Sequence, residues 1–283
     1  LLAMGVAVLA PNSVAATSLK FCSEGSPAFL DPAQSNTGTD FDVQDALFER
    51  LVAIERGALT RIPGLATSWD ISPGNLVYTF HLRAGVKFHT TAWFKPSREF
   101  NADDVLFTYQ RLIDRNHPFR KAYPTESSYI SELGWEKLIA KIEKVDALTV
   151  RFTLRQVAAP FLEHLSNTFA SVQSAEYAAQ LLKAGKARQI NTLPVGTGPF
   201  VFKSLQKDSN LRLLRNPHYW HGDLPRVDNL VFVVATDRMV RAQKLKAGEC
   251  DVSALASQND AVSYTHLRAH ETKANLVCRL LLE

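Results

Sequence analysis

The sequence predicts an α+β fold of a lobed α/β kind, because two groups of antiparallel strands are separated by helical segments. In the first group, apolar and polar residues alternate over residues 76–82, the period-two pattern of a half-buried strand. A second group of strand-like segments follows much later, between residues 200 and 234. The helical patterns lie between these groups and do not alternate with single strands, so a simple βαβ repeat is not predicted.

The N-terminal part is expected to hold one strand and one helix. Residues 18–22 form the predicted strand, and Gly and Pro in residues 23–27 indicate a turn. Apolar residues recur at spacings of three and four over residues 41–51, which predicts a helix capped by Asp40 or Asp42. The preceding residues are expected to form an irregular loop.

The first strand group is predicted at residues 51–55, 76–82 and 86–89, with a hairpin turn at Ala84 and Gly85. A helix is then expected behind Asn101, a favoured N-cap residue. Two carboxylates in its first turn, Asp103 and Asp104, suit the positive end of the helix dipole.

The remaining elements follow from the same patterns. A second hairpin, three helices and three strands are expected, with Ser174 as one N-cap and Gly248 ending the last helix. The hairpin covers residues 141–145 and 149–154, the helices 161–165, 174–185 and 238–247, and the strands 200–205, 211–215 and 229–234.

Composition limits the class of protein. The chain has 283 residues, of which 46% are hydrophobic and 21% charged, with a formal net charge of +4. These values are ordinary for a globular protein. The mild and evenly spread charge, without a basic run between aromatics, argues against nucleic-acid binding.

Both ends of the chain differ from the rest. An apolar run over residues 1–10 precedes small residues, which predicts a partial signal peptide in residues 1–16, cleaved near Ala15 or Ala16. Residues 262–283 resemble translated sequencing-adapter DNA, so we expect a non-native tail there. His266 and His270 in that tail have zinc-site spacing, but Ala274 stands where a zinc-protease motif needs its second His, so no metal site is predicted.

No catalytic or cofactor-binding group is predicted. Asp103 and Asp104 are explained as helix-capping residues, and the Gly196–Gly198 turn leads into a strand, unlike a phosphate-binding loop. His81 and His89 are expected to be packed or solvated. The chain is therefore predicted not to be an enzyme, with no cofactor and no metal.

Aromatic residues are assigned to packing in preference to stacking on a flat ligand. They are Trp69, Trp93, Phe94, Trp135 and Trp220. The two cysteines outside the tail, Cys22 and Cys250, either form a disulfide or remain separate buried thiols, and the sequence alone leaves both open.

Five phrases in fixed order carry a family resemblance. They are residues 62–69 (IPGLATSW), 78–89 (YTFHLRAGVKFH), 101–105 (NADDV), 195–200 (VGTGPF) and 248–252 (GECDV). With them, the chain resembles the peptide-binding receptors of ABC importers, extracellular solute-binding protein family 5. Residues 94–98 (FKPSR) make it most similar to the dipeptide and antimicrobial-peptide-resistance branch.

The resemblance implies a periplasmic binding protein type II-like fold. Residues 17–50 and 171–261 would form two parts of lobe I, residues 51–170 an inserted domain II, and lobe III would be missing. It also favours a Cys22–Cys250 disulfide, since dipeptide receptors pair cysteines at matching positions.

The function that the resemblance implies is capture of di- or oligopeptides in the periplasm by a monomer and delivery to an inner-membrane ABC permease. An envelope adaptor, or a haem or metal-chelate receptor on the same fold, is the alternative. Ligand contact is expected at Asn36, Thr37, Gly38 and Thr39, because short side chains and Gly permit close approach to a peptide backbone.

Overall fold

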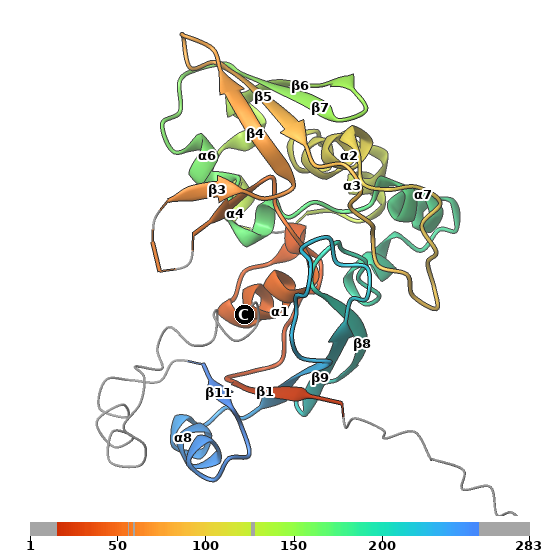
Figure 1. Ribbon diagram of the computed structural model, residues 1–283. Helices are drawn as coiled ribbons and strands as arrows, with labels where there is room; N and C mark the ends of the chain where they lie inside the picture. The colour runs from red at the N-terminus through yellow and green to blue at the C-terminus, as the bar shows by residue number, and fades with distance from the viewer. Residues whose placement is uncertain (1–15, 56, 59, 126–127, 255–283) are drawn as a thin grey trace, which may run out of the picture.

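The computed structural model describes residues 16–254, apart from residues 56, 59, 126 and 127. The predicted signal peptide up to residue 15 and the predicted tail lie outside the described residues. Buried hydrophobic side chains form two clusters. We call residues 51–195 the upper body, and residues 18–48 together with 200–254 the lower body, following the view in Figure 1.

Three sheets contain the described strands. A five-stranded sheet in the lower body has the order β11-β1-β10-β9-β8, a four-stranded sheet in the upper body has the order β4-β5-β7-β6, and β2 pairs with β3. The strands are β1 (Ser18–Ser23), β2 (Val52–Ile54), β3 (Arg61–Pro63), β4 (Ala66–Ile71), β5 (Val77–Leu82), β6 (Ile139–Asp146), β7 (Thr149–Leu154), β8 (Phe200–Gln206), β9 (Asn210–Arg215), β10 (Asn229–Val234) and β11 (Val252–Ser253).

Helices pack against the two larger sheets. Helix α1 lies on the side of the lower body that faces the upper body, and α2 lies under the upper sheet (Figure 1). The α-helices are α1 (Gly38–Leu47), α2 (Ala102–Ile113), α3 (Pro118–Ala122), α4 (Ser128–Glu132), α5 (Trp135–Leu138), α6 (Phe161–His164), α7 (Ala175–Lys183) and α8 (Arg238–Lys246). The 3-10 helices are η1 (Pro32–Gln34), η2 (Thr168–Ala170) and η3 (Ala187–Asn191).

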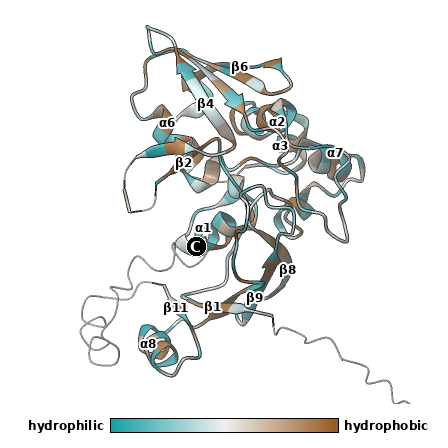
Figure 2. Cartoon of the chain, viewed as in Figure 1, coloured by the Kyte–Doolittle hydropathy of each residue, from teal (hydrophilic) through white to brown (hydrophobic). Residues whose placement is uncertain are grey.

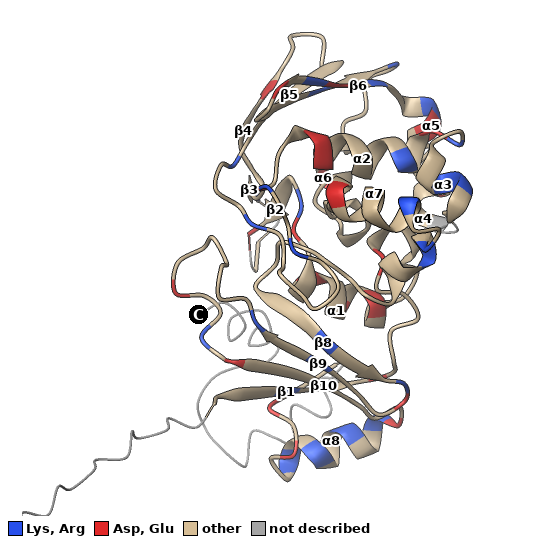
Figure 3. Cartoon of the chain, turned by 90° about the vertical axis from the view of Figure 1, so that its right-hand side faces the viewer, with Lys and Arg blue, Asp and Glu red and all other residues tan. Residues whose placement is uncertain are grey.

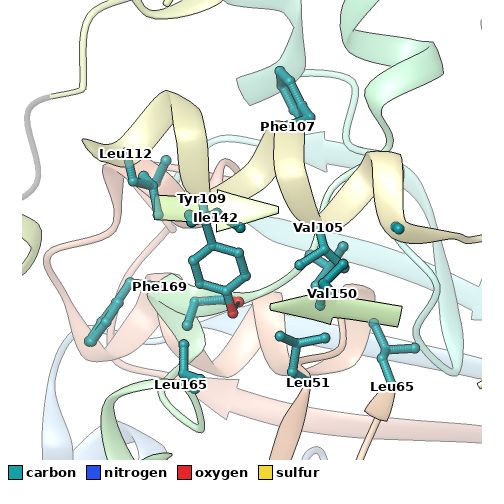
Figure 4. Close-up of a cluster of buried hydrophobic side chains, with 14 of the residues drawn as sticks. Leu51, Leu65, Val105, Phe107, Tyr109, Leu112, Ile142, Val150, Leu165 and Phe169 are labelled. Carbon is teal, nitrogen blue, oxygen red and sulfur yellow. Dashed lines mark hydrogen bonds between the residues drawn. The ribbon is translucent and has the colours of Figure 1, made fainter. Parts of the chain in front are cut away.

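The upper body is built on helix α2. Asn101 caps it in a capping box with Asp104, as the sequence predicts for Asn101. Val105, Tyr109 and Leu112 point from α2 toward strand residues such as Val150, while Phe107 points the other way (Figure 4). The apolar face of the helix thereby closes one side of the upper sheet, whose strand β5 buries alternate residues.

The lower sheet joins segments that are far apart in sequence. β1 pairs in parallel with β10, placing Ser18 opposite Asn229, and also in parallel with β11. Figure 2 shows hydrophobic segments in β1 and β8 below α1, whereas α8 is largely hydrophilic. Lys and Arg are spaced along α8 at the outer edge of this body (Figure 3).

A disulfide joins Cys22 to Cys250, whose Cα atoms lie 5.8 Å apart. It links β1 to the turn before β11, across a sequence separation of 228. Both cysteines are buried. The predicted disulfide is therefore present, and the alternative of two free thiols is wrong.

One predicted strand is absent from the structure, and one observed strand was not predicted. Residues 86–89 form no strand, because β5 already pairs with β4 on one side and β7 on the other. Instead, the Val86 carbonyl accepts from the Phe100 N–H and the His89 N–H donates to the Gly196 carbonyl. Strand β4, which contains Trp69, is absent from the prediction.

The predicted helix at residues 41–51 is also displaced. Helix α1 spans Gly38–Leu47, and Thr37 is its N-cap, so neither Asp40 nor Asp42 has the predicted capping position. The helix ends early because the Leu47 and Arg50 carbonyls accept hydrogen bonds from Gly198 and Leu65, which requires an extended chain there. None of the described helices is long and apolar enough to cross a membrane.

Packing extends beyond the predicted end of domain II at residue 170. Helix α7 and residues up to Val195 belong to the upper hydrophobic cluster. The domain boundaries given above stay a prediction.

Candidate functional site

The predicted ligand-contact segment forms the start of helix α1. Thr37 is extended (φ −129°), and its hydroxyl accepts from the Asp40 N–H at 3.3 Å. Asn36, Thr37 and Gly38 are exposed, whereas Thr39 is buried. The segment expected to be an irregular loop is therefore a helix cap and its first turn.

Asp40 holds this cap in place. Its buried carboxylate accepts from the N–H groups of Ala28 and Phe29 through Oδ1, at 2.8 and 3.0 Å. Its other oxygen accepts from the N–H groups of Asn36 and Thr37, both at 3.2 Å. Because one carboxylate fixes two separate stretches of backbone, the exposed residues are presented on a rigid support.

Thr39 is buried beneath the exposed residues of the cap. Its hydroxyl lies 3.0 Å from the Thr37 hydroxyl, and its methyl group lies beside Gly25. Gly38 has no positive φ, and an added Cβ would come no closer than 3.9 Å to Glu24. The fold therefore tolerates a side chain at position 38, and folding does not require a glycine there.

The surface beside the cap is acidic. The pKa of Asp42 is raised to about 6, mainly because the surrounding chain removes water from its carboxyl group. The nearby carboxylates of Asp45 and Glu24 raise it further. The Asp42 residue is nevertheless exposed on α1, so its carboxyl remains in contact with solvent. Arg50 offsets part of this charge by pairing with Asp45 at 2.7 Å.

The Gly196–Gly198 turn lies at the junction of the bodies. The Gly198 N–H donates to the Leu47 carbonyl at 3.0 Å. An added Cβ at Gly198 would lie 2.6 Å from the Leu47 carbonyl carbon, and one at Gly196 would overlap the Leu47 carbonyl oxygen. The glycines thus allow two backbone segments to approach closely. Because the turn is buried against the Leu47 backbone, it has no room for a phosphate.

Two titratable groups face this turn. His89 accepts from the Gly196 N–H at 3.2 Å and contacts the Gly198 carbonyl through Nε2 at 3.0 Å. Burial lowers the pKa of His89 to about 4, although the bond to Gly198 opposes the shift. The imidazole is therefore neutral at pH 7 and serves as a packed bridge, as the sequence suggested.

Glu49 is the second group, and no sequence pattern predicted it. The Trp220 indole N–H donates to its carboxylate at 2.9 Å, and the Tyr219 hydroxyl at 3.1 Å. Burial raises the pKa of Glu49 to about 7, against the lowering effect of hydrogen bonds from Thr197 and both rings and of the Arg50 charge. Arg83 stacks on the Trp220 ring at 3.9 Å.

A buried ion pair was also not predicted from the sequence. Arg111 of α2 pairs with Asp31 at 2.5 Å, and both side chains are nearly inaccessible. Asp31 also accepts from Gln173 at 3.0 Å and caps η1. Since Asp31 comes from the N-terminal segment and Arg111 from the upper body, the pair fixes one to the other.

The other candidate residues have structural partners. Asp104 completes the capping box of α2, as predicted, and also pairs with Arg98 at 2.6 Å. The Asp103 carboxylate lies in the same first turn but pairs with Lys144 at 2.9 Å and makes no cap hydrogen bond. The Nε2 atom of His81 lies 2.8 Å from Oδ2 of Asp70. Among the residues that the structure describes, no group of three or more His, Cys, Asp or Glu side chains could hold a metal ion.

The aromatic residues assigned to packing do pack. Trp135 is fully buried, and Phe94 is buried against Tyr177 at 5.0 Å between ring centroids. Trp69, Trp93 and Trp220 are partly buried against the upper cluster.

Comparison with known proteins decides the family. The profile described as "Bacterial extracellular solute-binding proteins, family 5 Middle" matches residues 60–273. The chain belongs to this family. The family 5 chain is 58% identical over 252 residues to di/tripeptide-binding protein 1 of Pseudomonas aeruginosa, covering 88% of the chain and 47% of that relative.

Solved structures support the same fold. A dipeptide-binding protein from Pseudoalteromonas, in complex with Met-Leu, is 36% identical with a TM-score of 0.84, covering 89% of this chain and 50% of that one. DppA of Helicobacter pylori, a periplasmic binding protein in complex with the peptide STSA, is 35% identical with a TM-score of 0.83, covering 89% and 49%.

A haem-binding relative also matches. Heme-binding protein A of Haemophilus influenzae is 42% identical over 233 residues, covering 82% of the chain and 42% of that relative. The family 5 chain spans about half the length of the curated relatives that it matches.

Proposed function

We propose that this chain is one half of a periplasmic receptor that captures di- or tripeptides and delivers them to an ABC permease in the inner membrane. The observation that carries the proposal is the 58% identity to a di/tripeptide-binding protein over nearly all of the chain. The mechanism follows the resemblance: a peptide binds against this half and a second half closes over it.

The exposed helix cap is the proposed contact surface for the peptide backbone. Asn36, Thr37 and Gly38 lie on the surface, supported from below by Asp40 and Thr39. A rigid, short-chained surface suits binding through the main chain, because it needs little ordering when the ligand arrives. Such contacts do not depend on the side chains of the peptide, which suits a tolerant receptor.

A chimera tests the function directly. Residues 16–254 would replace the matching half of the Pseudomonas aeruginosa di/tripeptide-binding protein 1, and Met-Leu, a tripeptide and haem would be titrated by calorimetry. Saturable binding of the peptides with no haem binding is the expected result. Binding of haem alone would favour the haem-receptor alternative, and binding of none of them in a folded chimera would favour an adaptor.

A pair of glycine variants of the same chimera tests the contact surface. Gly38→Leu places a side chain on the exposed cap, where the fold has room for it. We expect peptide affinity to fall at least tenfold while thermal unfolding is unchanged. Gly74→Leu is the matched control, because Gly74 is also exposed with nothing within 4 Å of an added Cβ. Equal affinity in both variants would exclude the cap from the ligand site.

A further inference from the structure

A cavity in the upper body shares no lining residue with the helix cap or the junction. Its volume is about 410 Å³, within the ~300–1,000 Å³ range of small-molecule sites. It opens between the α4–α5 corner, the segment after β7 and helix α6. Leu133, Leu138 and Ala158 supply its apolar wall, and Lys137 and His164 supply polar groups.

The walls of this cavity are formed by hydrogen-bonded backbone. Gly134 adopts a left-handed conformation (φ 62°) at the α4–α5 corner, and its carbonyl accepts from Lys137 and Leu138, both at 2.9 Å. The Leu138 carbonyl in turn accepts from the Arg155 N–H at 2.8 Å, which ties the corner to the end of β7. These hydrogen bonds hold the backbone of the α4–α5 corner in place beside the cavity.

One polar atom in the lining lacks a partner. The Nδ1 atom of His164 is shielded from solvent, yet no hydrogen bond satisfies it. Burial lowers the pKa of His164, so its ring is neutral at pH 7 and holds one proton that either nitrogen can carry. A shielded, unsatisfied nitrogen costs free energy unless a ligand or water pairs with it.

Lys137 adds a positive charge at the same cavity. It is exposed and forms no ion pair with another described residue. A cation beside a neutral hydrogen-bond donor, above an apolar wall, matches an anion that carries an aliphatic body. A cationic ligand would meet repulsion from Lys137 with no carboxylate in the lining to offset it.

We propose that this cavity binds a monoanionic carboxylate with an aliphatic chain. Its carboxylate pairs with Lys137 and accepts a hydrogen bond from His164, and its chain packs on Leu133, Leu138 and Ala158. The site is independent of the proposed peptide surface, since it shares no residue with residues 36–39.

Titration of the full chain with octanoate tests the proposal, with 1-octanol as the uncharged probe. Saturable octanoate binding that shifts the amide resonances of Gly134 and Ala158, with at least tenfold weaker octanol binding, is the expected result. Lys137→Met should weaken octanoate binding at least tenfold, while the matched surface variant Lys207→Met leaves it unchanged.

The His164 imidazole gives a second readout. Bound octanoate should raise the pKa of His164 in an NMR titration, because a nearby carboxylate favours the charged ring. Absence of saturable binding, equal binding of octanol, or unchanged affinity in Lys137→Met would each overturn the site.

Discussion

The upper and lower bodies reach stability by different routes. The upper body has a closed aromatic core, in which Tyr109 contacts both Trp135 and Phe152 through ring pairs at 5.8 and 5.1 Å. In the lower body, by contrast, β1 is held between β10 and β11, more than 200 residues away in sequence. Packing between near segments therefore stabilises the upper body, while links between distant segments stabilise the lower body.

The two bodies meet where backbones come into close contact. Leu47 and Arg50 offer carbonyls to Gly198 and Leu65, and glycine at position 64 is likewise required by close approach of the Arg50 carbonyl. The His89 imidazole and the Glu49 carboxylate add side-chain hydrogen bonds at this junction, so small changes there should affect both bodies.

Breaking the buried ion pair between Arg111 and Asp31 should destabilise the protein more than any other change considered. Arg111→Met leaves the Asp31 carboxylate buried without its cation, which should cost about 3–5 kcal/mol of unfolding free energy. Adding Asp31→Asn should recover much of that loss, since no uncompensated charge remains. Urea unfolding measures both.

An exposed pair gives the control for that experiment. Lys144→Met removes the partner of Asp103, whose side chain is 47% exposed, and should cost less than about 1 kcal/mol. Comparable losses in Lys144→Met and Arg111→Met would contradict the assigned role of the buried pair.

Removing the disulfide should loosen the lower body and leave the upper body unchanged, because both cysteines belong to the lower body. A Cys22→Ala, Cys250→Ala double variant should lose about 2–4 kcal/mol, because the cross-link restricts the unfolded chain. Hydrogen exchange should accelerate in β1 and β11 while β5 and β7 keep their protection. Equal acceleration in β5 would show that the bodies unfold as one unit.

A smaller loss is expected at the junction. Gly198→Ala places a Cβ 2.6 Å from the Leu47 carbonyl carbon and should cost up to about 3 kcal/mol by forcing the backbones apart. Gly74→Ala, in open space, should change the unfolding free energy by less than about 0.5 kcal/mol. The idea fails if the two variants have the same urea midpoint.

The smallest effect is a change in pH dependence. Because the folded pKa of Glu49 is raised from 4.5 to about 7, its contribution to stability is present at low pH and is lost as pH rises through that range. His89, lowered from 6.5 to about 4, acts oppositely: its contribution is present above pH 6.5 and is lost as pH falls toward 4.

Glu49→Gln isolates the first contribution. The variant keeps a neutral group for Trp220 and Tyr219, so its stability relative to the unsubstituted chain should improve as pH rises from 4.5 to 7. Thermal unfolding across this range measures the difference. A difference that does not change with pH would mean that Glu49 titrates normally.

Local patterns predicted most of the regular structure. The helix behind Asn101 follows from N-capping, and strand β5 follows from period-two alternation, because both patterns act within a few residues. The predicted strand at residues 86–89 was wrong, because a local sequence pattern does not show whether a neighbouring strand has a free edge to pair with.

The site was predicted less well because it depends on distant partners. Thr37 as N-cap depends on Asp40 binding the backbone at Ala28 and Phe29, which the spacing around residue 40 does not reveal. Glu49 looks like an ordinary surface residue at the end of a helix until Trp220 is placed beside it.

The strand order of the lower sheet has a consequence for synthesis. β1 is synthesised first, but its partner β10 begins at Asn229, so about 210 more residues must be synthesised before the two strands can pair. At roughly 5–20 residues per second, that delay is about 10–40 seconds. During that time residues 51–195, which contain both partners of every upper strand pair, are already complete, while β1 still lacks both of its strand partners.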